Sequence, residues 1–304
     1  MGQEHITKDY INQLFQETSN WGRWGSDDEK GTLNLITENQ KKAAAKLVKD
    51  GVSISLAFDL DKSQGPLNPT PMKHDLQIVE FAGDTWAVDS YSINYHGYAF
   101  SHIDALCHLI YQDKMYNGYS KQQLESTGSK KLGIQNMKEG IFSRGVLVDI
   151  PEMKGVPYLE PETAILAEDL EAWEKKTGIS IGVGDVLLIR TGRHARESAM
   201  GPWNYTESAA GLHPSVVKWL RDRDVAVLGS DGASERYPSG LQQSQSPIHF
   251  LVIYGLGMPI LDNLDLESLA RYARAHNRYE FLFIAAPLRV EGGTGSPLNP
   301  IATF

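Results

Sequence analysis

The chain has 304 residues, of which 41% are hydrophobic and 22% are charged, and its formal net charge is -9. These are ordinary values for a globular enzyme with a substantial core. The negative charge argues against nucleic acid or an anionic membrane as the main partner, and no apolar run approaches the roughly 20 residues that span a bilayer.

The N-terminal segment predicts a helix over residues 8–18, because Ile11, Leu14 and Phe15 recur at helical spacing. A loop rich in glycine and tryptophan follows, over residues 20–34. Its aromatic side chains, Trp21 and Trp24, either fasten the loop to the core or form a lid and pocket wall over an aromatic substrate. Physical reasoning leaves both interpretations open.

The rest of the chain alternates between helical and strand patterns, which predicts one continuous α/β unit. Thr37 is expected to cap a helix over 39–49, and alternation predicts a strand over 52–58 before a proline-containing loop over 61–72. Apolar runs predict buried strands at 145–150 and 185–190 and a further strand at 225–228, while helices are predicted at 167–176 and 214–223. We expect a single domain over 1–304, with a helical and loop extension over about 1–50.

The residues that carry chemistry lie between positions 102 and 108, which read His-Ile-Asp-Ala-Leu-Cys-His. On an extended backbone His102 and Asp104 share one face and lie about 6.6 Å apart along the strand, close enough to converge on one ion. A hydrogen-bonded structural histidine is the common alternative. Clustering imidazoles with a carboxylate among apolar residues costs desolvation unless a partner such as a cation satisfies them.

His108 would lie too far along a straight strand to join that pair, so the chain is expected to turn after Asp104. This placement suits His108 to donating or accepting a proton rather than to binding the same ion. Cys107 alternates onto the opposite face and is interpreted as a small core residue rather than a nucleophile. As the single cysteine, it excludes an internal disulfide bond and, with the polar N-terminus, favours a cytoplasmic location.

This stretch resembles the signature of the cyclase family, which includes bacterial kynurenine formamidases and isatin hydrolases. The signature reads His-x-Gly-Thr-His-x-Asp-x-Pro-x-His. His102, Asp104 and His108 match its last three polar positions, and Ser101 stands at the threonine. The resemblance implies that His102 and Asp104 bind metal and that His108 is the general acid and base.

The resemblance extends over nearly the whole chain and implies the family's α/β fold, a swivelling β/β/α domain. In this fold a central β-barrel-like mixed sheet is surrounded by helices. The resemblance also implies a homo-oligomer, a homodimer or a homotetramer, in which Trp21 and Trp24 could reach a neighbouring subunit's site.

The chain differs from the family in the first half of the signature. Tyr98 stands where the family has its first histidine, and His96 lies two residues earlier, beside Gly97. A bend at Gly97 would bring His96 into the missing position, whereas on a straight strand it would lie about 20 Å from His102. Tyr98 is the competing candidate, as a ligand or as a hydrogen-bond donor to substrate. Phe100 replaces a glycine and would narrow the pocket.

A second block resembles the family's distal element, in which a histidine and a later glutamate complete a one- or two-metal centre. His249 matches that histidine, and Asp262 stands near the glutamate with a side chain shorter by one methylene. Without the resemblance, His249 would be interpreted as a helix cap and Asp262 as a turn residue.

Together these residues predict a metal-dependent hydrolase. A Zn²⁺ or Mn²⁺ ion held by His96, His102, Asp104, His249 and Asp262 would activate water for attack on the carbonyl of a small cyclic amide, imide or aryl formamide. Mixed nitrogen and oxygen ligands do not decide between the two metals. A lactone hydrolase with the same site and a catalytically weakened binding protein remain as alternatives.

Overall fold

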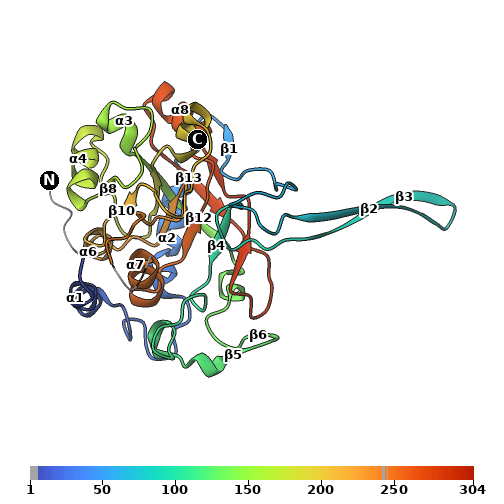
Figure 1. The fold of residues 1–304 in the computed structure, drawn as a ribbon, viewed down its shortest axis with the longest axis horizontal. Coiled ribbons are helices and arrows are strands. Elements are labelled where there is room, and N and C mark those ends of the chain that lie inside the picture. Colours follow the sequence, from blue (N-terminus) through green and yellow to red (C-terminus); the bar gives the residue numbers. More distant parts are fainter. Residues whose placement is uncertain (1–5, 242–243, 245) are drawn as a thin grey trace.

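The computed structural model describes residues 6–241, 244 and 246–304. Its centre is a nine-stranded mixed sheet that curls like half of a barrel, with helices around it (Figure 1). The predicted α/β class with a barrel-like mixed sheet surrounded by helices is confirmed. In spatial order the strands are β1 (Ser53–Ser55), β15 (Ile301–Thr303), β13 (Glu280–Ala285), β7 (Ile141–Asp149), β9 (Val186–Arg190), β11 (Val227–Ser230), β12 (Ile260–Asp262), β4 (His102–Asp104) and β14 (Gly295–Pro297).

The middle of the sheet is parallel and its two sides are antiparallel. β7, β9, β11 and β12 run in the same direction, whereas β4, β13, β14 and β15 each pair antiparallel with their neighbours. The predicted strands at 145–150 and 185–190 are confirmed as β7 and β9, which pair from Gly145 opposite Val186. Their apolar runs are buried, as expected for parallel strands covered on both faces. The predicted strand at 225–228 forms two residues later, as β11.

The helices agree with the predicted ranges except at their ends. The helix predicted over 8–18 is present with those bounds, and Thr7 caps it by accepting a hydrogen bond from the Tyr10 amide. The helix predicted over 39–49 ends at Ala45, because only Ala44 of it is buried and little packing holds a further turn. The helices are α1 (Lys8–Thr18), α2 (Glu38–Ala45), α3 (Ile150–Lys154), α4 (Ala167–Thr177), α5 (Arg193–Met200), α6 (Val216–Asp222), α7 (Pro247–His249), the π-helical η5 (Phe250–Leu256) and α8 (Glu267–His276).

Short elements fill the connections. The strand predicted over 52–58 is present only as β1, and the loop predicted over 61–72 contains no regular helix or strand. The remaining short elements are the 3₁₀ turns η1 (Gly31–Leu35), η2 (Tyr116–Gly118), η3 (Lys121–Gln123) and η4 (Ile134–Met137), and the strands β5 (Leu124–Glu125), β6 (Gly128–Ser129), β8 (Ala164–Ile165) and β10 (Gly211–Leu212).

A long antiparallel hairpin, which we call the arm, projects away from the body of the molecule (Figure 1). It consists of β2 (Lys73–Phe81) and β3 (Asp84–Ser92), joined by Ala82 and Gly83, whose φ angles of 55° and 89° suit a tight hairpin turn. The sequence analysis did not predict this hairpin, although its apolar residues alternate with polar ones.

The main core is a contiguous cluster of buried apolar side chains that extends from Ile6 to Phe304 and takes in α1, and a smaller cluster is formed by Tyr205, Ala209, Ala233 and Tyr237. Within the described residues, every helix is too short or too polar to cross a bilayer. The single domain, its extension and the cytoplasmic location stay predictions.

Candidate metal centre

The centre is built on β4, the short strand between β12 and β14. Its register places Asp262 opposite His102 and Gly295 opposite Asp104. Two blocks 160 positions apart in the chain therefore lie side by side. Ile103 points into the core and is fully buried, so His102 and Asp104 share the other face, as the alternation predicts.

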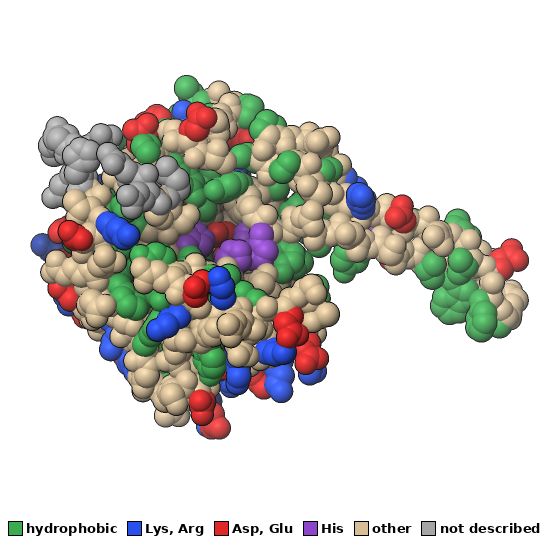
Figure 2. All heavy atoms as spheres, turned by 60° about the horizontal axis from the view of Figure 1, so that its bottom comes forward, with side chains coloured by type: hydrophobic (Ala, Val, Ile, Leu, Met, Phe, Trp, Pro, Cys, Tyr) green, Lys and Arg blue, Asp and Glu red, His purple; other side chains and the backbone are tan. Residues whose placement is uncertain are grey.

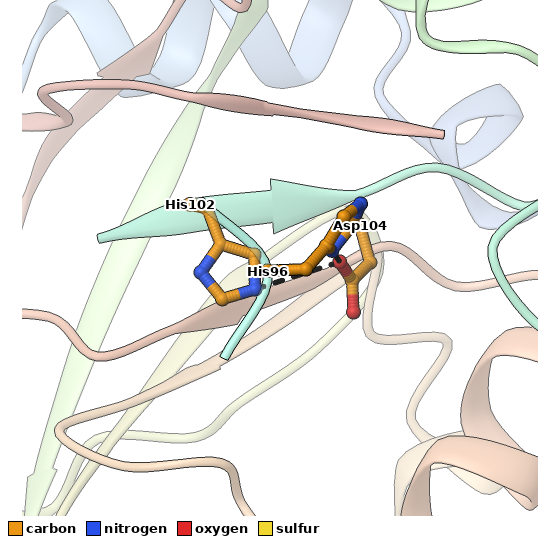
Figure 3. Close-up of side chains that lie close together, drawn as sticks. All are labelled: His96, His102 and Asp104. Atoms are coloured by element: carbon orange, nitrogen blue, oxygen red, sulfur yellow. Dashed lines mark ion pairs between the residues drawn. The ribbon is translucent and has the colours of Figure 1, made fainter. Parts of the chain in front are cut away.

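His96 reaches this face because the chain bends before the strand begins. Residues 96–100 form a series of bends, and Gly97 adopts a φ of 133°. The Nδ1 atom of His96 lies 3.1 Å from Oδ1 of Asp104, and its ring centroid is 5.4 Å from that of His102 (Figure 3). Its Nε2 atom lies 3.0 Å from the Thr294 hydroxyl, in a glycine-rich segment that approaches closely. The structure thus brings His96, rather than Tyr98, beside Asp104.

Tyr98 points away, with its hydroxyl 3.1 Å from the hydroxyl of Tyr237. Phe100 is buried, and its carbonyl accepts a hydrogen bond of 2.8 Å from Nδ1 of His102. Because a carbonyl only accepts, this bond fixes the tautomer and leaves the Nε2 lone pair of His102 free, 3.6 Å from Oδ1 of Asp104. Phe100 therefore orients a ligand through its backbone.

His108 faces Oδ2 of Asp104, whereas His96 faces Oδ1 of the same carboxylate. The predicted turn after Asp104 is present, and it places Nε2 of His108 3.7 Å from Oδ2 of Asp104. The rings of His96 and His108 stack at a centroid distance of 4.1 Å. Burial lowers the pKa of His108, so its imidazole is neutral near pH 7 and can accept a proton.

His249 and Asp262 complete a second group of ligands around Asp104. Nε2 of His249 lies 3.2 Å from Oδ2 of Asp262 and 3.8 Å from Oδ2 of Asp104. Burial lowers the pKa of His249, but the neighbouring carboxylates of Asp262 and Glu235 raise it more, to well above its usual value. Burial would raise the pKa of Asp104, but the surrounding imidazoles lower it below its usual range.

Asp104 joins two sets of possible ligands: His96, His102 and Asp104 form one set, and Asp104, His249 and Asp262 form the other. Within each set the ligand atoms lie within 4.8 Å of one another. Among the described residues, Oδ1 of Asp104 and Oδ1 of Asp262 are buried without a hydrogen-bond donor. Buried carboxylate oxygens without donors, together with imidazole nitrogens, are what a divalent cation would satisfy, so these residues fit one or two metal ions.

Glu235 is a functional residue that the sequence analysis missed. It is fully buried, and its Oε1 atom lies 3.0 Å from Nδ1 of His249 and accepts the His249 amide at 2.8 Å. Burial raises the pKa of Glu235. The contact orients the His249 ring so that Nε2 faces Asp262 and Asp104. The sequence signal that could have pointed to Glu235 is a charged residue in a stretch of small residues just after β11.

The bent segment that carries His96 is held from behind by side chains outside the centre. The Asn263 amide donates to the Gly97 carbonyl at 2.6 Å, and Asn263 in turn accepts a bond of 2.6 Å from Arg193. Arg193 also donates to the Tyr98 carbonyl at 3.0 Å. Asn263, the residue after Asp262, therefore fixes the bent segment that carries His96, rather than only making a turn.

Two further sequence interpretations can be compared with the structure. Cys107 is buried, and burial raises the pKa of its thiol to about 11, which agrees with a core residue. The Trp21 indole donates to the Tyr254 carbonyl at 2.7 Å, and Arg23 stacks on Trp24. These contacts fasten the tryptophan loop to η5 and to itself, and a substrate contact for either tryptophan stays a prediction.

A cavity of about 260 Å³ lies between α1, residues 109–111 and the start of η5. Leu109, which follows His108, and Pro247 and Phe250, which flank His249, line it together with Ile110 and Tyr111. Histidine side chains gather in a hollow of the molecular surface, with apolar side chains on part of its rim (Figure 2). Chain neighbours of His108 and His249, rather than the two histidines themselves, are thus among the residues that line this cavity.

Comparison with known proteins agrees with this architecture. The family model described as Putative cyclase matches residues 38–235, which include four of the histidine and aspartate residues above and Glu235. A crystal structure described as a novel cyclase is 33% identical, with a TM-score of 0.86, over 94% of this chain and 100% of that chain. This match confirms the predicted fold.

The isatin hydrolase of Roseibium aggregatum is 28% identical over 150 residues, which are 47% of this chain and 53% of that protein. The match spans about half the length of this curated relative. Isatin hydrolase A from Ralstonia solanacearum shares the fold, with a TM-score of 0.56 at 21% identity over 83% of this chain and 91% of that chain.

Proposed function

The chain belongs to the Putative cyclase family, and from this premise we propose that it is a metal-dependent hydrolase. The observation that carries the proposal is the position of Asp104, whose two oxygens face different imidazoles. Oδ1 faces His96 and His102, and Oδ2 faces His108 and His249. A carboxylate in this position is suited to bridging two ions.

His96, His102 and Asp104 would hold one ion, and Asp104, His249 and Asp262 would hold another. A bound Zn²⁺ or Mn²⁺ ion supplies Lewis acidity, which lowers the pKa of water and polarises a carbonyl. Glu235 and the Phe100 carbonyl hold the rings of His249 and His102 with Nε2 toward the centre.

His108 performs the proton transfers in this proposal. Its neutral imidazole accepts the proton of the attacking water and returns it to the leaving nitrogen, so that the carbonyl carbon becomes a carboxylate. The stacked ring of His96 restricts the orientation of His108.

The cavity favours a small substrate with an apolar or aromatic part. Its volume of about 260 Å³ is just below the ~300–1,000 Å³ that is typical of ligand pockets. The curated relative is named an isatin hydrolase, and isatin is a cyclic amide. We therefore propose a small cyclic amide, imide or aryl formamide, with its ring against Tyr111 and Phe250.

The test begins with elemental analysis of protein purified without chelator or affinity-tag metal. One or two equivalents of zinc or manganese per chain support the proposal. The loaded protein is then assayed with a cyclic amide, an aryl formamide and a lactone of matched ring size. A higher kcat/KM for the lactone would favour the ester alternative, and failure to bind either metal would contradict the hydrolase.

A further inference from the structure

A second cavity lies next to the cavity described above, between α1, η5 and residues 111–112. Its volume is about 320 Å³, within the ~300–1,000 Å³ that is typical of ligand pockets. Four residues line both cavities: Lys8, Asn12, Tyr111 and Phe250. The two cavities therefore share a wall, and we call the second one the aromatic cavity.

Four aromatic rings that contact one another line the aromatic cavity. Phe250 and Tyr254 stack with their ring centroids 5.2 Å apart, and the Tyr111 ring meets them edge-on at 4.8 and 5.8 Å. The fourth ring, Phe15 of α1, lies 5.4 Å from Tyr254. Because these rings hold one another in place, they form a fixed apolar surface that suits a flat aromatic ligand.

The polar residues that α1 contributes to the aromatic cavity lie along one strip of the helix. Lys8, Asn12 and Gln16 are spaced four residues apart, which places their side chains on the same face. Among the described residues that line either cavity, only Lys8 is charged. A cation and amide groups beside an aromatic surface complement an anion that is attached to an aromatic ring.

The charge of Lys8 is not balanced by a neighbouring carboxylate. Within the part of the chain that the structure describes, Lys8 makes no ion pair. Asp9 and Glu17, the acidic residues of α1, do not line the aromatic cavity. Asp113, which follows Gln112, pairs with Lys121 at 2.6 Å. Lys8 is therefore available to an anionic ligand, although the net charge of the chain is -9.

We propose that the aromatic cavity is a binding site for an aromatic carboxylate. The aromatic ring lies on Tyr111, Phe250 and Tyr254, and the carboxylate accepts hydrogen bonds from Lys8 and Asn12. The site goes beyond the proposed function, because none of these residues belongs to the metal centre. The proposed hydrolysis converts an aryl amide into a carboxylate, so its product falls in this ligand class, and only that link rests on the proposed function.

Fluorine NMR of para-fluorobenzoate with the full chain tests the site. The protein is first stripped of metal with a chelator, so the result depends neither on a carboxylate bound to an ion nor on any hydrolysis. We expect para-fluorobenzoate to bind roughly fivefold more tightly than para-fluorobenzamide, which has nearly the same shape without the charge. No binding of the carboxylate, or equal affinity for the two ligands, would overturn the proposal.

Replacing Lys8 identifies the source of this preference. Lys8→Met is expected to weaken para-fluorobenzoate binding by roughly fivefold and to leave para-fluorobenzamide within about twofold, since only the charge interaction is lost. The matched control is Lys46→Met, which removes an exposed lysine at the end of α2, outside both cavities. Equal losses in the two variants would attribute the preference to net charge and contradict the site.

Photolabelling then distinguishes the two cavities. The probe is para-benzoylbenzoate, an aromatic carboxylate that reacts with nearby side chains under light. Adducts that benzoate suppresses are expected on Phe15, Gln16, Gln112 or Tyr254, which line the aromatic cavity but not its neighbour. Adducts confined to Ile110, which lines only the neighbouring cavity, or to other parts of the chain, would refute the assigned position.

Discussion

The metal centre and the arm depart from the usual distribution of side chains in opposite directions. In the centre, charged groups such as Asp104 and Asp262 are buried, whereas on the arm Ile78 and Phe81 are exposed. Burying an ion without a partner costs several kcal/mol, and leaving apolar surface in water costs about 25 cal/mol per Å². The centre is therefore complementary to a cation, whereas the arm leaves apolar side chains in water.

The largest effect is expected from Asp104→Asn, which removes the carboxylate shared by both ligand sets while keeping the shape of the side chain. We expect loss of bound metal and a fall in kcat/KM on the order of a thousandfold, since metal assistance supplies several kcal/mol. Elemental analysis and substrate assays measure both. Asp84→Asn on the arm is the matched control, and equal metal content in the two variants would disprove the bridging role.

Replacing His108 should lower the rate of catalysis without changing metal binding. His108→Asn is expected to retain the metal and to lower kcat by roughly a hundredfold or more, because general acid and base catalysis is lost. The measurement is kcat alongside metal stoichiometry in the same preparation. Turnover that matches the wild type would remove His108 from the proton-transfer role.

The two candidates for the missing ligand can be compared directly. Since His96 lies 3.1 Å from Asp104 and Tyr98 bonds to Tyr237, His96→Ala should weaken metal affinity, whereas Tyr98→Phe should leave it within about twofold. Competition with a chelator of known affinity measures both. The reverse order of effects would mean that Tyr98 is the ligand.

A smaller effect is expected at Glu235, which touches a ligand rather than the ion. Glu235→Gln keeps the size of the side chain but removes the charge that orients His249, so metal affinity should fall by about 10–100-fold. Chelator competition with the purified variant checks this change. An unaltered affinity would indicate that Glu235 only satisfies the backbone amide of His249.

The sequence by itself determined the features that depend only on residues close together in the chain, such as strand alternation and helical spacing. The alternation that places His102 and Asp104 on one face and Ile103 in the core was readable directly, because side chains on a strand alternate whatever lies around them. The same holds for the apolar runs of β7 and β9 and for the helical spacing of α1.

Only the tertiary structure decided which distant groups meet. The bend at Gly97 that brings His96 to Asp104 depends on Asn263, which is 166 positions away, and the partner of His249 is a glutamate without a motif. The alternating residues of the arm are visible in the sequence, but only the tertiary structure shows that the hairpin projects from the body and leaves these residues exposed. Ligand geometry depends on loop conformations held by long-range hydrogen bonds, and a local pattern carries no information about the other end of such a bond.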